Sequence, residues 1–404
     1  PGIATPREAD MREALRAGLV ATVEAWRDDI SGRAILETRP VPGRVTARRT
    51  VPELGATVLT LANGVEVWLK PTDFKHDQVL FSSYSHGGLS LASEAEYLDA
   101  ALATSLVTVG GIGGFSPIDL GKLLTGRVAG ASPYIGSYNH GINGSSSPKD
   151  LETALQLAYL TFTAPNTDPS AFDLLKRRIE ANLANQAQSP GAVFGERVRR
   201  VNTLDHYTVT PVRPDDIPRL RADRMLGFYR TLFSNAANFT FFFVGSFTED
   251  AVVPLIETYI GSLPSRGTAD AESHDMRMRF PDMVVRETVR KGREPRSQTV
   301  ITFFADTQLD EAETHRTQAA TEILEHRLRD ILREQLGGTY SVGVGYSSTA
   351  PQPGYGTVSV QFGSAPENVD TLTAAVMAEI ERLRRDGPTE ADVAVVKEGE
   401  RSGL

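Results

Sequence analysis

The spacing of apolar residues along the chain predicts where helices and strands lie. Residues 11–28 show the helical period of about 3.6, whereas residues 58–72 and 77–88 alternate as half-buried strands do. Asn63-Gly64 divides residues 58–72 into two short apolar runs, which predicts a β-hairpin. The apolar side of the first helix holds Leu15, Leu19, Val20 and Val23.

Residues that favour helix starts mark several further elements. Ser147 followed by Pro148, and Asp168 followed by Pro169, have the order of an N-cap and a first helical residue. A Phe-rich run of consecutive apolar residues predicts a buried strand. We therefore predict helices over residues 94–110, 145–165, 168–186 and 248–264, and a buried strand over 238–247.

A long stretch of the pattern occurs twice. Residues 364–400 repeat the order of residues 146–181, with a Ser and a Pro before a long amphipathic helix and a second Pro-initiated helix after it. Gly-, Ser- and Tyr-rich strands precede both copies, so we expect a long-period duplication. The second copy stops at Leu404, inside its second helix, and we expect the chain to be part of something longer.

These elements predict an α+β fold of two duplicated modules. Each module is expected to be a mostly antiparallel sheet with helices on one face, the second module being truncated. The expected divisions are a linker with a leading helix (1–50), a first module (51–266), a polar linker (267–285) and an incomplete second module (286–404).

Composition narrows the classes of function. The 404 residues are 40% hydrophobic and 23% charged, as in ordinary globular proteins, and the net charge of −9 argues against nucleic acid as a partner. There is no Cys, which excludes disulfides and thiolate metal sites. No apolar run approaches the roughly 18 residues of a membrane helix, so no membrane insertion is expected. The chain starts at Pro1 without a signal peptide, and we expect an upstream segment.

The histidines do not have the spacing of a catalytic zinc site. Such a site often places two ligands four residues apart on one helical face, and no two of the seven histidines have that spacing. They are His76, His86, His140, His206, His274, His315 and His326.

One near-match to a metal motif lies in Glu322-Ile-Leu-Glu325-His326, one letter away from His-x-x-Glu-His. Glu322 and His326 share a helical face with Arg329 and Arg333, and two guanidinium groups there oppose a dication. Glu325 has the favourable position for an ion pair with Arg329. We interpret this stretch as a solvated polar face; metal binding and contact with a peptide or partner remain alternatives.

The stretch Leu-Arg-Glu-Gln-Leu-Gly-Gly-Thr-Tyr-Ser-Val, residues 332–342, resembles the Leu-Arg-Glu-x-Leu-Gly-x-x-Tyr-Ser-Val signature of the pitrilysin-type zinc metallopeptidases, the inverzincins. Further similar segments are LANGVEVWLKPT, SHGGLSLAS and YIGSLP, and the resemblance covers roughly residues 55–404. The chain is similar to the C-terminal, non-catalytic half of bacterial zinc proteases built as one long chain.

The resemblance implies four α+β modules in two halves that close around a substrate chamber. Members of the family carry His-x-x-Glu-His on the helix that follows a segment like SHGG. Here that helix, residues 94–111, has no His and carries Asp99 instead. The resemblance therefore implies that this chain holds no zinc and is inactive, and that zinc lies in a catalytic half.

The family also implies a role for two residues. Arg333 and Tyr340 match an Arg and a Tyr that contact the substrate backbone, which suits guanidinium and hydroxyl donors. We thus predict a non-catalytic half that forms one chamber wall and partners the N-terminal catalytic half of the same protein and a peptide substrate.

Two other functions remain open. The first alternative is an inactive paralogue that binds peptide or serves as a structural subunit beside a separate active peptidase; the second is an enzyme with a rebuilt metal site. The resemblance suggests a periplasmic location, with the cytoplasm left open.

Overall fold

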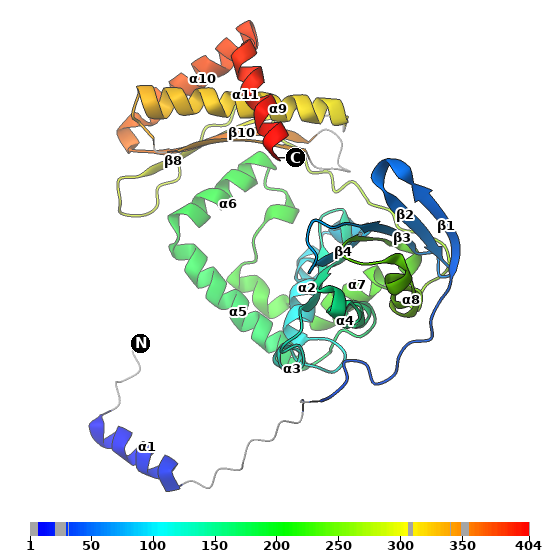
Figure 1. The fold of residues 1–404 in the computed structure, drawn as a ribbon. Coiled ribbons are helices and arrows are strands. Elements are labelled where there is room, and N and C mark those ends of the chain that lie inside the picture. The colour runs from blue at the N-terminus through cyan, green and yellow to red at the C-terminus, as the bar shows by residue number, and fades with distance from the viewer. Residues whose placement is uncertain are drawn as a thin grey trace.

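The structure is a computed structural model that describes residues 7–20, 30, 32–305, 310–339, 341–348 and 355–403. Two sheets organise it: one of seven strands in the order β1-β2-β3-β7-β4-β6-β5, and one of three in the order β8-β10-β9 (Figure 1). Each sheet carries helices, so the α+β class expected from the sequence is confirmed.

The strands of the first sheet are β1 (Val45–Val51), β2 (Ala56–Leu61), β3 (Glu66–Pro71), β4 (Val79–His86), β5 (Ala129–Ile135), β6 (Asn139–Ser146) and β7 (Thr240–Gly245). Its neighbouring strands run antiparallel except β3 and β7, which are parallel. The predicted hairpin is present, since β2 pairs with β3 and Gly64 takes a positive φ of 87° in the turn. The second sheet comprises β8 (Ser297–Ala305), β9 (Val342–Ser348) and β10 (Gly356–Ser364), all antiparallel.

The helices are α1 (Glu8–Val20), α2 (Tyr97–Gly110), α3 (Pro117–Leu123), α4 (Leu151–Thr163), α5 (Pro169–Gln188), α6 (Pro190–Asn202), α7 (Ala222–Leu232), α8 (Glu249–Tyr259), α9 (Glu311–Arg329), α10 (Val369–Asp386) and α11 (Glu390–Gly403). Asp168 caps α5 as predicted, accepting from the Ser170 N–H at 2.9 Å. Ser147 and Pro148 take the predicted N-cap and first positions, but in a short 3₁₀ turn (Pro148–Asp150) that precedes α4, and the Ser147 hydroxyl donates to Asp150 instead of accepting from a backbone N–H. The first predicted helix runs over Glu8–Val20, and residues 21–29 lie outside the described residues.

The strand orders of the two sheets reveal the same topology twice. In the first sheet β4-β6-β5 are neighbours, with α2 between β4 and β5 in the chain and α4 and α5 after β6. In the second sheet β8-β10-β9 are neighbours, with α9 between β8 and β9 and α10 and α11 after β10. This correspondence supports the duplication inferred from the sequence.

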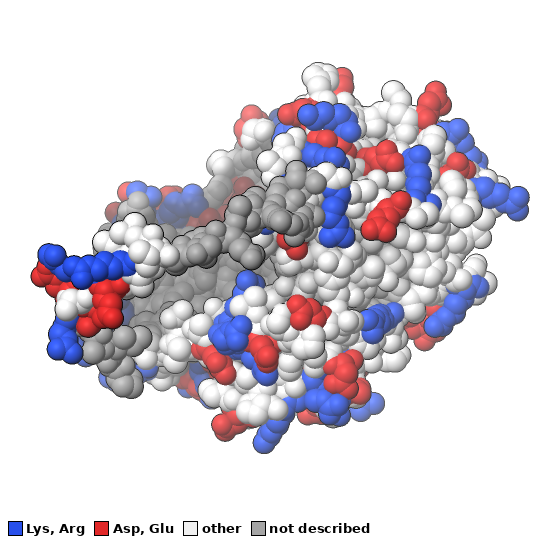
Figure 2. All heavy atoms as spheres, turned by 90° about the horizontal axis from the view of Figure 1, so that it is seen from below, with Lys and Arg blue, Asp and Glu red and all other residues white. Residues whose placement is uncertain are grey.

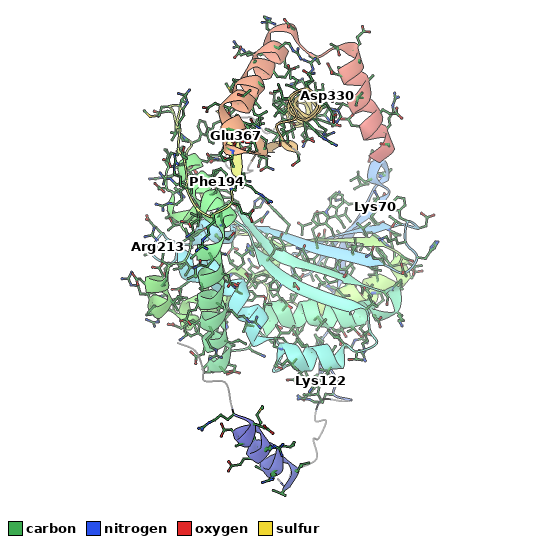
Figure 3. The ribbon with its side chains drawn as sticks, turned by 90° about the vertical axis from the view of Figure 1, so that its left-hand side faces the viewer. Lys70, Lys122, Phe194, Arg213, Asp330 and Glu367 are labelled. Atoms are coloured by element: carbon green, nitrogen blue, oxygen red, sulfur yellow. The ribbon has the colours of Figure 1, made fainter. Side chains whose placement is uncertain are left out.

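The core of the first module lies between one face of the large sheet and its helices. Phe81, Phe241 and Phe243 point into it and are at most 3% exposed. Phe81 lies over Gly144 on the neighbouring strand, where an added Cβ would come within 2.0 Å of the ring. Figures 1 and 3 show α2, α3, α4, α7 and α8 on the side away from the second module, so the other face of this sheet, the open face, turns toward that module. The exception is α6, which reaches the second module, where the Tyr355 hydroxyl donates to the Asn202 carbonyl. Lys122, on α3, marks the helical side in Figure 3.

The second module has a smaller core of its own. Leu324, Leu328 and Leu332 pack from α9 and the turn after it against Val360 of β10 and Val376 of α10. Ile323 is also buried and Ile331 is partly buried on this side of the helix, whereas Ala320 is exposed.

The segment between the modules is ordered, although the sequence suggested a polar linker. The Ser273 hydroxyl accepts from Gly87 N–H at 3.0 Å and donates to the Tyr138 carbonyl at 2.8 Å, and Met276 is buried. Farther along, Phe280 stacks on Phe304 of β8 with ring centroids 5.2 Å apart. The linker therefore joins the two modules through side-chain contacts that its polar composition did not reveal.

The surface shows no dominant sign of charge on the face seen from below. Lys and Arg side chains alternate there with Asp and Glu, with wide areas of neither kind (Figure 2). Within the described residues, none of the helices is both long and apolar enough to cross a membrane.

Candidate functional site

The helix that follows SHGG, α2, is built as a structural element. Its buried carboxylate, Asp99, accepts a hydrogen bond from the backbone N–H of Arg221 at 2.9 Å, just before α7 begins. Burial raises the pKa of Asp99 above its usual range. With no His on this helix and Asp99 engaged by a backbone donor, the residues here do not fit a zinc ion.

His140 of β6 lies beside the Gly87-Gly88 turn and, like Asp99, forms hydrogen bonds to the backbone. Its Nδ1 accepts from Gly88 N–H at 3.3 Å, and its Nε2 lies 3.0 Å from the Leu232 carbonyl. Both contacts suit one neutral tautomer with the proton on Nε2. Burial lowers the pKa of His140 to about 4. This imidazole therefore joins β6, the Gly-Gly turn and the end of α7.

Within the near-match to a metal motif, residues 322–326, the carboxylate of Glu325 has a structural role. Glu325 Oε2 accepts from the backbone N–H of Val344 in β9 at 3.0 Å, and Oε1 accepts from Arg329 at 2.6 Å. The predicted ion pair is thus confirmed, and the carboxylate is also tied to the sheet. Among the residues that the structure describes, no group of three His, Cys, Asp or Glu could hold a metal ion.

Arg333 lies on the π-helical turn Asp330–Gln335 that ends α9. The buried Leu332 anchors this turn in the core, while the Arg333 side chain is half exposed, with Nε 3.4 Å from Glu334 Oε1. The turn thus presents the guanidinium at the surface. Tyr340, the other residue implicated by the sequence motif, lies outside the described residues.

The glycines of the motif shape the reversal from α9 into β9. Gly337 takes a φ of 58°, a left-handed conformation that favours glycine. At Gly338 an added Cβ would come within 2.6 Å of a Leu372 side-chain carbon. The Leu-Gly-Gly part of the motif therefore fixes the direction in which the chain leaves the Arg333 turn.

Sequence reasoning missed a buried ion-pair network beside this turn. Arg327 is 14% exposed and contacts Glu379 at 3.2 Å and Asp392 at 2.5 Å, joining α9 to α10 and α11. These contacts raise the pKa of Arg327, and the Arg327 guanidinium holds the pKa of Asp392 far below its usual range. A signal was present, because Glu379 follows Leu372 and Val376 at helical spacing on the apolar side of α10.

Comparison with known proteins finds similarity to a family of peptidases. Residues 219–400 match the family described as Peptidase M16 inactive domain. The chain is therefore similar to the M16, or pitrilysin-type, peptidases. It is 27% identical over 392 residues to the zinc protease PQQL-like of Arabidopsis thaliana, with 93% of this chain and 38% of that protein covered. It is 26% identical over 345 residues to the probable zinc protease PqqL of Escherichia coli, covering 84% of this chain and 36% of that protein. The chain thus spans a little over a third of the length of these relatives.

Solved structures of a bacterial protease and of a peptidase domain share the fold. The periplasmic protease PqqL from Escherichia coli superposes with a TM-score of 0.79 at 21% identity, over 98% of this chain and 44% of that chain. A peptidase M16 inactive domain from Pseudomonas fluorescens gives a TM-score of 0.67 at 16% identity, over 87% of this chain and 84% of that chain. The resemblance to pitrilysin-type peptidases inferred from the sequence is therefore confirmed. An inactive M16 domain also fits a chain without a catalytic zinc.

Proposed function

We propose that this chain is the non-catalytic half of a zinc metalloendopeptidase and forms one wall of its substrate chamber. The observation that carries the proposal is the match to the inactive M16 domain combined with an α2 that lacks His where the family places its zinc ligands. The catalytic half would hold the zinc. The relatives are zinc proteases of more than twice this length, which supports a partner of comparable size.

In this proposal Arg333 and Tyr340 supply contacts to the peptide backbone. The Arg333 side chain is half exposed, whereas the preceding residue, Leu332, is fully buried. The backbone that carries Arg333 is therefore anchored in the core. A guanidinium offers several N–H donors in a fixed plane, which suits the carbonyl oxygens of an extended peptide. The role of this chain is then to bind and orient the peptide, not to cleave it.

A second function is an inactive paralogue that binds peptide beside a separate active subunit. The match that favours it is the inactive domain from Pseudomonas fluorescens, 84% of whose chain is covered by this one. Under this function the zinc-bearing subunit would be a different polypeptide. The location of either assembly is proposed to be the periplasm, as described for the Escherichia coli protease PqqL.

The test is hydrolysis of a quenched fluorescent peptide of about ten residues in the presence of zinc. We expect no cleavage by the chain alone and cleavage after it is mixed with the natural segment that carries His-x-x-Glu-His. Cleavage by the purified chain alone would overturn the proposal and return attention to Glu322 and His326. If the two parts bind each other but the mixture cleaves no faster than the zinc-bearing part alone, the structural-subunit function is favoured.

A further inference from the structure

Four apolar side chains meet on the open face of the first sheet. Trp68 of β3 lies opposite Phe242 of β7, and Leu80 of β4 lies opposite Val244 of β7. Phe242 and Val244 are each 38% exposed and Leu80 is 47% exposed. Trp68, Leu80, Phe242 and Val244 are called the apolar patch below.

Strand alternation places the apolar patch on the face opposite the core. The residues that flank Phe242, Phe241 and Phe243, are fully buried, and those that flank Leu80 are at most 3% exposed. An open sheet face is usually polar, and scattered apolar residues on a surface are ordinary. Four on three adjacent strands form a contiguous surface, and such surfaces mark interaction sites.

Trp68 is held in a fixed orientation. Its Nε1–H donates to Glu66 Oε1 at 2.6 Å, and the Arg49 guanidinium lies 5.0 Å from the ring centroid. Arg49 and Glu66 also contact each other at 3.3 Å, and the Trp68 and Phe242 ring centroids are 6.2 Å apart. A ring that is already ordered loses little entropy when a ligand packs on it.

The surroundings of the apolar patch are largely uncharged. Arg49 and Glu66 neutralise each other beside it, and Lys70, which is opposite Val244, lies at one end of β3 (Figure 3). By register, the same face continues with the neutral side chains Ser82, Asn143, Ser145 and Thr240. Apart from Lys70, such a surface gives a charged ligand no matching counter-charge, so it suits a neutral apolar ligand.

The dimensions agree with an extended peptide. Neighbouring strands are roughly 4.8 Å apart, so β3, β7 and β4 spread the apolar patch over about 10 Å. Side chains two residues apart in an extended peptide are separated by roughly 7 Å. Two such side chains fit on the apolar patch together.

We propose that the apolar patch binds apolar side chains of an extended, uncharged peptide segment. This inference rests on the proposed function, because the open face turns toward the second module, which carries Arg333 (Figure 3). Arg333 would contact the backbone of a peptide without regard to its sequence, whereas the apolar patch would select for its side chains. The proposal therefore assigns to this chain a preference for apolar stretches in the substrate.

The experiment uses Trp68 as its own reporter in the full chain. The protein has two Trp residues, so Trp26→Phe leaves Trp68 as the single Trp, which is excited apart from the Tyr residues. The probe is a neutral Gly/Ser peptide of about ten residues with Phe and Leu two residues apart, so that both point to one face, and the comparison peptide has Ser at both places. We expect a saturable shift of Trp68 emission with the first peptide alone, and we expect it to persist in 1 M NaCl, where charge interactions are screened beyond about 3 Å.

Variants then locate the binding site. Phe242→Thr keeps a good strand former and should weaken binding about tenfold, as expected for a lost apolar contact. Leu80→Thr should weaken binding as well. Because the two variants alter different strands, weaker binding in both is not explained by misfolding of one of them. Ile118→Ser, at a residue 72% exposed on α3 on the helical side, should leave binding unchanged.

Several outcomes would overturn the proposal. One is an equal emission shift with the Ser peptide, and another is unchanged affinity in both Thr variants. A third is loss of binding in 1 M NaCl, which would assign the binding to the charge of Lys70. A shift that follows protein concentration without peptide would assign the apolar patch to a second copy of the chain instead. The assay needs neither zinc nor cleavage, so its failure is distinguishable from failure of the proposed function.

Discussion

The carboxylate of Glu325 accepts a hydrogen bond from the backbone N–H of Val344, at 3.0 Å. β9 pairs with β10 alone among the described strands, and this N–H, on the other edge of β9, is taken up by the Glu325 side chain of α9. A free edge N–H is a template for another strand, and a charged side chain there opposes such pairing. Within the near-match to a zinc motif, Glu325 therefore protects a sheet edge.

Glu325→Ala should expose that edge. The Val344 N–H loses its partner, and we expect faster amide hydrogen exchange in residues 341–348 together with a loss of about 1–2 kcal/mol in local stability. Exchange is measured by mass spectrometry. Glu313→Ala, which removes an exposed ion pair with Arg316 on the same helix, is the matched control and should leave this segment unchanged.

Arg327→Met should destabilise the second module strongly. It leaves Glu379, 3% exposed, and Asp392 without the cation that joins them, and loss of one partner of a buried pair costs about 3–5 kcal/mol. Urea unfolding followed by signals from residues 310–403 measures the change. Arg384→Ala, at a side chain 78% exposed, should cost less than about 1 kcal/mol. Equal effects of the two variants would show that the network is not stabilising.

His140 should make the first module sensitive to acid. Its pKa is about 4 in the folded chain against 6.5 in the reference state, so the unfolded chain binds the proton first. The stabilisation is complete above about pH 6.5 and is lost as the pH falls toward 4, by about 3 kcal/mol in all. Urea midpoints measured across this range test the slope. His140→Gln should be less stable at pH 7 and should show a shallower decline; an unchanged slope would contradict the assignment.

Gly338→Ala should disturb the turn that presents Arg333. The added Cβ would come within 2.6 Å of Leu372, and overpacking of this kind costs about 1–3 kcal/mol. Gly345→Ala on β9 meets no atom within 4 Å and is the matched control. Thermal unfolding compares the two, and similar melting temperatures would contradict the close packing at Gly338.

Arg333→Ala should reduce the turnover of the mixed halves about tenfold or more if the guanidinium binds the peptide in the transition state, since each 1.4 kcal/mol corresponds to tenfold. Arg333→Lys keeps the charge but lacks the planar donors and should recover only part of the activity. Glu334→Ala removes the neighbouring carboxylate and is the control. Parental turnover in Arg333→Ala would remove this residue from the substrate site.

The sequence by itself determined most of the elements and the resemblance to the M16 peptidases. Local residue preferences placed the hairpin around Gly64 and the cap at Asp168. The Phe-rich strand was placed correctly, but the prediction that it is buried holds for one face only, because Phe242 and Val244 of β7 are each 38% exposed. The motif of residues 332–342 carried the resemblance, and the absence of His from residues 94–111 led to the prediction of inactivity. The Glu325–Arg329 pair also followed from helical spacing alone.

Only the tertiary structure decided which distant residues meet. Glu325 reaches Val344, Arg327 reaches Glu379 and Asp392, and the linker around Ser273 joins Gly87 to Tyr138. The apolar patch likewise exists because β7 inserts between β3 and β4, although its residues are far apart in the chain. Local patterns say which face of a strand or helix is apolar, but they do not say which strands become neighbours, because strand order is set by the packing of the whole module.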